Sequence, residues 1–172
     1  MRGPVLMSDL FSVAGTELLD RLEFPAPYAA RIASLRRVMD DLDFEINVFA
    51  GIIGGRLAHE PRYTAVQKIP GIGPALGAVL VAEIGDIGRF VSASKLTCWA
   101  GLTPKHHESD THVRRGRITK QGSRLAGWAA IESVKTVSKT SAVGVLRERV
   151  GDHRGRNIAS VAAARLQLEF VF

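Results

Sequence analysis

The sequence is poor in cysteine, in aromatic residues and in long apolar runs. Cys98 is the only cysteine among 172 residues, which excludes a fold held by intrachain disulfides and fits the cytosol. No run approaches the roughly 18 consecutive apolar residues of a membrane-spanning helix, and the N-terminus lacks the apolar segment of a signal peptide. We therefore expect a soluble, cytoplasmic protein with no membrane partner, in which Cys98 is a buried apolar side chain.

The scarcity of aromatic residues also bears on the fold class. Aromatic residues make up 6% of the chain, whereas hydrophobic residues make up 46%, with alanine, leucine and valine frequent among them. This composition supplies a packed core but favours helices over a β-sandwich. We therefore predict an all-α or mainly α fold.

Charge is distributed unevenly along the chain. Residues 1–60 hold six Lys and Arg against nine Asp and Glu, a net charge of −3, and residues 61–172 hold seventeen against eight, a net charge of +9. An uneven balance of this kind predicts that the second segment binds an anionic partner such as nucleic acid. A solvated basic surface without a partner is the alternative.

Residues 27–58 contain the most regular apolar pattern. Apolar residues follow one another at alternating spacings of four and three, at Tyr28, Ile32, Leu35, Met39, Leu42, Ile46, Phe49 and Ile53. These spacings predict one long coiled-coil-like helix, which we expect to end at Gly54-Gly55. The apolar seam could pair with another copy, giving a homo-oligomer, or pack on the chain's own domain.

The remaining residues predict shorter helices separated by turns. Apolar spacing together with helix-capping and helix-breaking residues places helices over residues 8–24, 62–69, 74–84, 92–100, about 123–139 and 157–167. Ser92 and Ser123 are predicted N-caps, and Gly85 is predicted to end the helix that begins at Pro74. No strand is predicted. The helix that begins after Ser123 should have an apolar face that packs on the core, formed by Leu125, Trp128, Ala129, Ile131 and Val134.

Residues 66–80 have the form of a helix-hairpin-helix motif. Gly71 and Gly73 would permit backbone conformations closed to other residues and would let a phosphate approach the backbone. The first N–H groups of the following helix would then bind that phosphate, with Lys68 as the nearest additional charge. Such a motif contacts the DNA backbone and reads no base sequence. A tight turn between two helices that binds nothing is the alternative.

Residues 103–124 are polar, basic and rich in turn formers. We interpret them as a loop that grips DNA phosphates through Lys105, Arg114, Arg115, Arg117, Lys120 and Arg124. The histidines at 106, 107 and 112 match no metal-ligand spacing, so no metal site is predicted here. Ser109, surrounded by cations, could attack a phosphodiester, although most serines in loops only form turns.

These segments together resemble a known family. Ile69-Pro-Gly-Ile-Gly-Pro74, Ala100-Gly-Leu-Thr-Pro104, Glu108-Ser-Asp-Thr111 and Arg115-Gly-Arg-Ile-Thr-Lys-Gln-Gly-Ser123 are similar, in this order, to the C-terminal half of the transposases of insertion-sequence family 110, with its relatives 116 and 902. A further similar stretch is Ile84-Gly-Asp-Ile-Gly-Arg-Phe90. The resemblance covers about residues 66–135. Members of this family are RNA-guided recombinases.

The resemblance implies a domain organisation. Residues 1–26 would be the end of an N-terminal RNase H-like domain that this chain otherwise lacks, residues 27–58 the connecting coiled coil, and residues 62–172 the helical C-terminal transposase domain. In the family, the N-terminal domain carries acidic ligands for Mg²⁺. No cofactor is therefore expected on this chain itself.

The resemblance also implies a function in DNA transposition and recombination. Ser109 would be the nucleophile of a composite active site that includes the metal-bearing domain, so we expect the isolated chain to be inactive. DNA and a guide RNA are the expected partners. A non-catalytic helix-hairpin-helix DNA-binding module and an inactive transposase remnant remain the alternatives.

Overall fold

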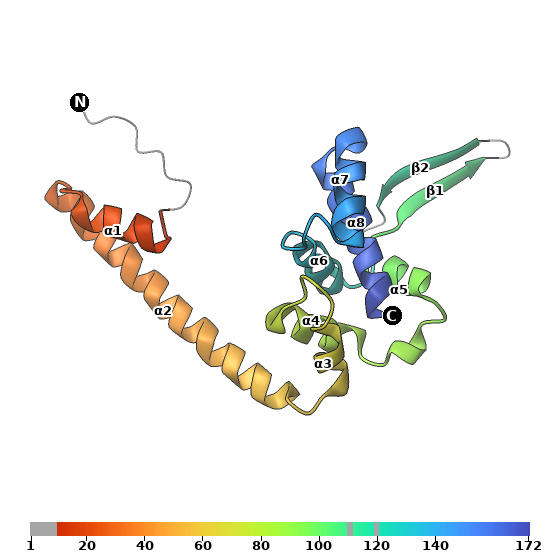
Figure 1. Cartoon of the computed structure of the whole chain (residues 1–172), viewed down its shortest axis with the longest axis horizontal. Coiled ribbons are helices and arrows are strands. Elements are labelled where there is room, and N and C mark those ends of the chain that lie inside the picture. Colours follow the sequence, from red (N-terminus) through yellow and green to blue (C-terminus); the bar gives the residue numbers. More distant parts are fainter. Residues whose placement is uncertain (1–9, 110–111, 119–120) are drawn as a thin grey trace. The chain divides into compact units, whose positions relative to one another are not determined.

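The chain is mainly helical, as predicted, with one two-stranded sheet (Figure 1). The computed structural model describes residues 10–109, 112–118 and 121–172, and for residues 105–117 it describes the backbone alone. In chain order the elements are α1 (Val13–Arg21), α2 (Ala26–Leu57), α3 (Pro61–Val66), α4 (Pro74–Ile84), the 3-10 turn η1 (Ile87–Arg89), α5 (Ala93–Trp99), β1 (Pro104–Ser109), β2 (His112–Ile118), α6 (Arg124–Ser133), α7 (Ala142–Arg154) and α8 (Arg156–Val171). No described helix is both long and apolar enough to cross a membrane.

The chain divides into two compact units between Phe49 and Ala50, so the first unit contains α1 and α2 up to Phe49. Asp20 on α1 accepts a hydrogen bond from the Arg36 guanidinium of α2 at 2.5 Å, and this bond raises the pKa of Arg36 above its ordinary value. The predicted end of α2 at Gly54-Gly55 is wrong, because the helix continues to Leu57. Two glycines cost a helix about 1 kcal/mol each relative to alanine, but they do not break it.

The core of the second unit is built from small and aliphatic residues. Helix α8 packs against α5, α6 and α7, while α4 packs against α3 and α6. Alanines line the contacts of α6 and α8, which lets the helices approach closely, and leucines and isoleucines of the neighbouring helices fill the centre. Fully or nearly fully buried are Leu80, Ile84, Leu96, Ala126, Ala129, Ala130, Val134, Ala163, Ala164 and Leu168.

Helix α6 differs from the prediction in its buried face and in its length. Ser123 caps it as predicted, accepting a hydrogen bond from the Ala126 amide at 3.0 Å. Leu125 and Trp128, however, are 54% and 49% exposed, because close packing against α4 and α8 selects the alanine face instead. The helix ends at Ser133 rather than near Lys139.

Helix α7 and the exposure of Cys98 also differ from the prediction. Helix α7 follows it, although no helix was predicted there, and Ser141 caps α7 by accepting a hydrogen bond from the Gly144 amide at 3.0 Å. The expected burial of Cys98 on α5 is also wrong, since this side chain is exposed. Helix α5 buries Leu96 and Thr97, and the next position along a helix points about 100° away from that face.

The segment interpreted as a loop is a β-hairpin. Strands β1 and β2 pair antiparallel, with Ser109 opposite His112, His107 opposite Arg114 and His106 opposite Arg115. The prediction of no strand is therefore wrong for residues 104–109 and 112–118. The segment lacks the apolar alternation by which strands are recognised, and cross-strand backbone hydrogen bonds form without it.

Candidate nucleic-acid interface

Helices α3 and α4 pack on each other as a helical hairpin with a short turn between them, and an ion pair fixes its open end. Glu60 caps α3 by accepting a hydrogen bond from the Arg62 amide at 3.2 Å, and the Arg62 guanidinium donates to the same carboxylate at 2.7 Å. These two bonds lower the pKa of Glu60 from its ordinary value of 4.5 to about 2. The guanidinium also donates to the carbonyl of Gly85, so the start of α3 is joined to the end of α4.

Gly71 is required at the turn between these helices. Its φ of +88° lies in the left-handed region that favours glycine. A Cβ at this position would also lie 2.1 Å from the Ser133 carbonyl oxygen and 2.6 Å from Cγ2 of Val137. The neighbouring Ile72 is 3% exposed and anchors the turn in the core. The turn is therefore held against the end of α6.

Gly73 differs from Gly71. Its φ of −82° and ψ of −178° are ordinary extended backbone, so the expectation that this glycine has a conformation closed to other residues is wrong. No atom lies within 4 Å of the position that a Cβ would take. Gly73 is the N-cap of α4 and has no side chain to cap the helix, which leaves the approach to this helix end open.

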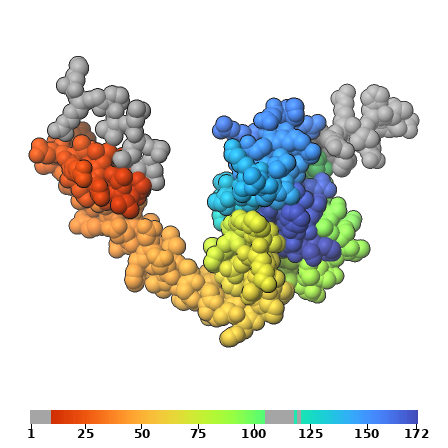
Figure 2. Space-filling view, viewed as in Figure 1, coloured from red at the N-terminus to blue at the C-terminus, as the bar shows by residue number. Residues whose placement is uncertain are grey.

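The first amides of α4 are available to a ligand. Pro74 carries no N–H group, and the first helical hydrogen bond runs from the Gly77 amide to the Gly73 carbonyl at 2.8 Å. Among the described residues, no acceptor pairs with the amides of Ala75 and Leu76. Lys68 is exposed in the same turn. Figure 2 shows this segment, coloured yellow, at the surface of the compact unit.

Two residues that were not predicted support the turn. The Gln167 side chain of α8 is 1% exposed, and its Nε2 donates to the Pro70 carbonyl at 2.6 Å. A Cβ added to Gly77 would lie 3.4 Å from side-chain atoms of Tyr63 and Val66, so the absence of a side chain at Gly77 allows the close packing of α3 on α4. Neither role has a local sequence signal, because both depend on tertiary contacts.

The register of the β-hairpin groups the predicted catalytic and basic residues. Residues directly opposite one another lie on the same face, and faces alternate along each strand. Ser109, His112, His107 and Arg114 therefore share one face of the ribbon, while Arg115 lies on the other. Ser109 is the last residue of β1.

The other residues predicted to contact DNA lie farther from Ser109 along the β-hairpin or outside it. Lys105 lies in β1 at a register irregularity between Pro104 and His106, and Arg117 lies near the end of β2. Arg124 is exposed on the first turn of α6. Lys120 lies outside the described residues, as do Asp110 and Thr111.

A cluster at the base of the β-hairpin fixes where the ribbon leaves the helices. Gly122 has a φ of +96°, and a Cβ there would overlap the Trp99 carbonyl oxygen. The Ser123 amide donates to that same carbonyl at 3.0 Å, and the Ser123 hydroxyl donates to Glu83 of α4 at 2.6 Å. Ser123 was predicted only as a helix cap, so its bond to Glu83 adds a connection from the ribbon's base to the helical hairpin.

A cation–aromatic stack lies beside this base. The Arg89 guanidinium carbon lies 4.6 Å from the ring centre of Trp99 and 4.7 Å from that of Phe90. The two ring centres are 5.3 Å apart. Arg89 also donates to the Glu83 carbonyl at 3.3 Å. This stack joins η1 to α5 and thereby positions Trp99, whose carbonyl receives the Ser123 amide.

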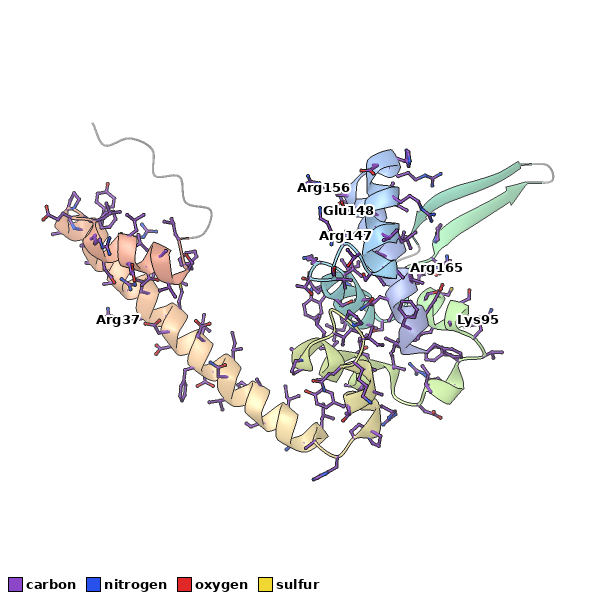
Figure 3. All side chains as sticks on the ribbon, in the orientation of Figure 1. Arg37, Lys95, Arg147, Glu148, Arg156 and Arg165 are labelled. Carbon is purple, nitrogen blue, oxygen red and sulfur yellow. The ribbon has the colours of Figure 1, made fainter. Side chains whose placement is uncertain are left out.

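A polar recess of about 400 Å³ lies along α7 and the start of α8. Figure 3 labels three of its residues, Arg147, Glu148 and Arg156. Arg147 donates to the Val134 carbonyl at 2.7 Å, and Glu148 pairs with Lys139 at 3.3 Å. Arg147, Glu148 and Lys139 are therefore paired within the chain. The described side chains contain no group of three potential metal ligands, and those of His106, His107 and His112 lie outside the described ones.

Residues 63–150 match the model of the Transposase IS116/IS110/IS902 family, which is just over half of the chain. A probable family 20 transposase of Pseudomonas aeruginosa is 25% identical over 145 residues, covering 81% of this chain and 43% of that protein. The transposase for insertion sequence element IS1111A of Coxiella burnetii is 29% identical over 104 residues, covering 58% of this chain and 29% of that protein.

A third relative is a pilin gene-inverting protein of Moraxella bovis, 39% identical over 54 residues, which cover 31% of this chain and 17% of the relative. The chain thus spans less than half the length of each of these three relatives. The matched residues 63–150 include all but the first two residues of the helical hairpin, together with the β-hairpin and the base that joins them. The chain belongs to the Transposase IS116/IS110/IS902 family.

Proposed function

We propose that this chain is the DNA-binding C-terminal part of a transposase and acts in DNA transposition and recombination. The observation that carries the proposal is the turn between α3 and α4. There, a helix N-terminus with unpaired amides follows a turn that contains the exposed Lys68. A phosphate is the ligand for which such a helix end is best suited, since the N–H groups and the helix dipole both favour negative charge.

The β-hairpin supplies the second part of the proposed interface. Its strands carry Lys105, Arg114, Arg115 and Arg117. A two-stranded antiparallel ribbon is narrow enough to enter a DNA groove, and its cations would neutralise the phosphates on either side. The bond between Ser123 and Glu83 joins the base of the ribbon to α4, which supports a joint grip by both elements.

We further propose that Ser109 is the nucleophile toward DNA. Its Oγ would form a bond to a backbone phosphorus and lose its proton to a base, while one P–O ester bond breaks and its oxygen takes up a proton as a free hydroxyl. Arg114 shares the face of Ser109 in the hairpin register and would stabilise the charge on the phosphoryl oxygens. The name of the Moraxella bovis relative, which refers to gene inversion, supports recombination chemistry within the family.

In this proposal the metal belongs to another domain. The family resemblance implies an RNase H-like domain with Mg²⁺ ligands, and Mg²⁺ held there would polarise the phosphate that Ser109 attacks. The chain by itself would then bind DNA without cutting it. Its proposed partners are DNA, a guide RNA and, through α2, further copies of the same chain.

A non-catalytic DNA-binding module is the second candidate. It is favoured by the helical hairpin, whose unpaired Ala75 and Leu76 amides would bind a phosphate without any contribution from Ser109. The two candidates predict the same DNA affinity and differ only in whether Ser109 is needed for strand transfer.

The DNA-binding function is tested by titrating labelled duplex DNA with the chain and its variants. Gly73→Val places a side chain in open space where the phosphate would approach, so affinity should fall about tenfold to a hundredfold, the equivalent of a charge-assisted hydrogen bond. Lys68→Ala should weaken binding, whereas Lys95→Ala, which removes the same charge from α5, should not. Gly73→Val with unchanged thermal stability and unchanged affinity would contradict the proposal.

A further inference from the structure

Helix α2 presents an uncovered apolar seam. Along its 32 residues no side chain is buried. Seven of the eight seam residues are at least 37% exposed, namely Tyr28, Leu35, Met39, Leu42, Ile46, Phe49 and Ile53. A contiguous apolar stripe of this length is typical of an interaction surface rather than of a solvated helix. Its regular heptad spacing fits another helix of the same kind.

Apart from Arg56 in its last turn, the charges of α2 are arranged in two blocks about the middle of the seam. Three arginines precede Met39, at positions 31, 36 and 37, and four carboxylates follow it, at positions 40, 41, 43 and 45. Among the described ion pairs, only Arg36 of this set has a partner, Asp20 on α1. Arg31, Asp43 and Glu45 are exposed, and they lie at heptad positions that flank the seam.

We propose that α2 pairs with α2 of a second copy in the antiparallel orientation, with the two helices overlapping over the whole seam. Tyr28 then lies opposite Ile53 of the second copy, Ile32 opposite Phe49, Leu35 opposite Ile46 and Met39 opposite Leu42. This orientation rests on the self-association proposed above and specifies its geometry. A second copy fits this surface because its α2 carries the same apolar seam. When the second helix runs in the opposite direction, its carboxylate block lies along the arginine block of the first.

Charge decides between the two orientations. In the antiparallel pair the arginine block of one helix lies along the carboxylate block of the other. Arg31 then lies within side-chain reach of the second copy's Glu45, and Arg36 within reach of its Asp43. In a parallel, in-register pair, Arg31 would flank Arg36 of the second copy. The two arginine blocks would then lie side by side, and so would the two carboxylate blocks. Like charges at these flanking positions disfavour association.

Two charge reversals give opposite results for the two orientations. Arg31→Glu would place like charges opposite one another in the antiparallel pair, whereas in the parallel pair it would create an attraction to Arg36. Glu45→Arg would likewise disrupt only the antiparallel pair. The double variant Arg31→Glu/Glu45→Arg restores the antiparallel attraction with exchanged signs. Each single variant should weaken dimerisation of the full chain about tenfold, and the double variant should restore it to within about twofold.

Sedimentation equilibrium of the full chain measures these dissociation constants. Arg37→Glu is the matched control, because it makes the same charge change at the heptad position opposite the seam (Figure 3) and should change the dissociation constant less than either flanking reversal. Circular dichroism establishes that every variant keeps its helix content. A tighter dimer with Arg31→Glu would overturn the antiparallel orientation and leave self-association standing. A monomeric wild-type chain would overturn both.

Disulfide trapping tests the register without relying on charge. The exposed Cys98 is first replaced by serine. A Tyr28→Cys chain mixed with an Ile53→Cys chain should then cross-link, whereas Tyr28→Cys alone should not. In the antiparallel pair the two copies of position 28 are about 37 Å apart along the helix axis at 1.5 Å per residue. Efficient cross-linking of Tyr28→Cys with itself would overturn the proposal.

Discussion

At the scale of single residues, the turn between α3 and α4 depends on two glycines that do different things. Gly71 has a left-handed backbone and lies against α6, whereas Gly73 has an ordinary backbone and open surroundings. The sequence pattern predicts the turn but assigns the same role to both. A glycine's φ follows from the path of the chain and from its tertiary neighbours, and neither can be read from its position in the motif.

Alanine substitutions should separate these two roles. Gly71→Ala should lower the free energy of unfolding by about 2–4 kcal/mol, since it combines left-handed strain with a clash against the Ser133 carbonyl. Gly73→Ala should cost less than about 1 kcal/mol, the difference between glycine and alanine at a helix N-cap. Urea unfolding followed by circular dichroism measures both values, and equal destabilisation by the two would contradict this account of the turn.

The position of Ser109 relative to its neighbouring arginines also depends on structure at the scale of single residues. The sequence places Ser109 among cations but cannot say which of them lie near it. The antiparallel register puts Arg114 on the serine's face and Arg115 on the other. These arginines are adjacent in the sequence and carry the same charge, so they form a natural matched pair.

In an enzyme completed with the RNase H-like domain of a relative, Ser109→Ala should abolish strand transfer while leaving DNA affinity within about twofold of the wild-type value. Arg114→Ala should reduce the rate of strand transfer about 10²–10³-fold, a typical cost of losing one group that stabilises the transition-state charge. Arg115→Ala should reduce it less than about tenfold. Strand transfer that persists in Ser109→Ala would remove the serine from the mechanism and favour the non-catalytic module.

At the scale of elements, the sequence predicts helices best where capping and breaking residues mark both ends. Helix α4 begins at Pro74 and ends before Gly85, as predicted, and α6 begins after Ser123. The β-hairpin and α7 were not predicted. The strands are polar on both faces, and α7 has an irregular apolar pattern with many charges, so neither contains the periodicity on which such predictions depend.

Helix α3 provides a pH-dependent prediction at this scale. The pKa of Glu60 is lowered by its bonds to Arg62, so its contribution to stability is present above its unfolded-state pKa and is lost as the pH falls through the folded-state value. Glu60→Gln should therefore be less stable than the wild type at pH 7, and the difference should shrink as the pH falls from about 4.5 to about 2. Urea unfolding at pH 7, 4 and 2.5 follows this change. A difference that grows toward acid pH would contradict the assigned cap.

At the scale of the whole molecule, two compact units have different characters. The first carries an uncovered apolar helix with opposed charge blocks, which suits self-association. The second has a packed core and carries the helical hairpin and the basic ribbon. The charge balance and the heptad spacing of the sequence predict a change of character near residue 60, whereas the two compact units divide between Phe49 and Ala50, within α2. The sequence does not predict the base of the ribbon, where Glu83, Trp99 and Ser123 come together from separate parts of the chain.

The central claim is that the second unit grips the DNA backbone through several phosphate contacts, and salt dependence tests it most directly. The logarithm of the association constant for duplex DNA, plotted against the logarithm of the salt concentration, should fall with a slope of about −4 or steeper, as several released counterions require. Lys68→Ala should reduce the magnitude of that slope by about 0.9. A folded wild-type chain that does not bind at low salt, or whose affinity does not change with salt, would contradict the claim.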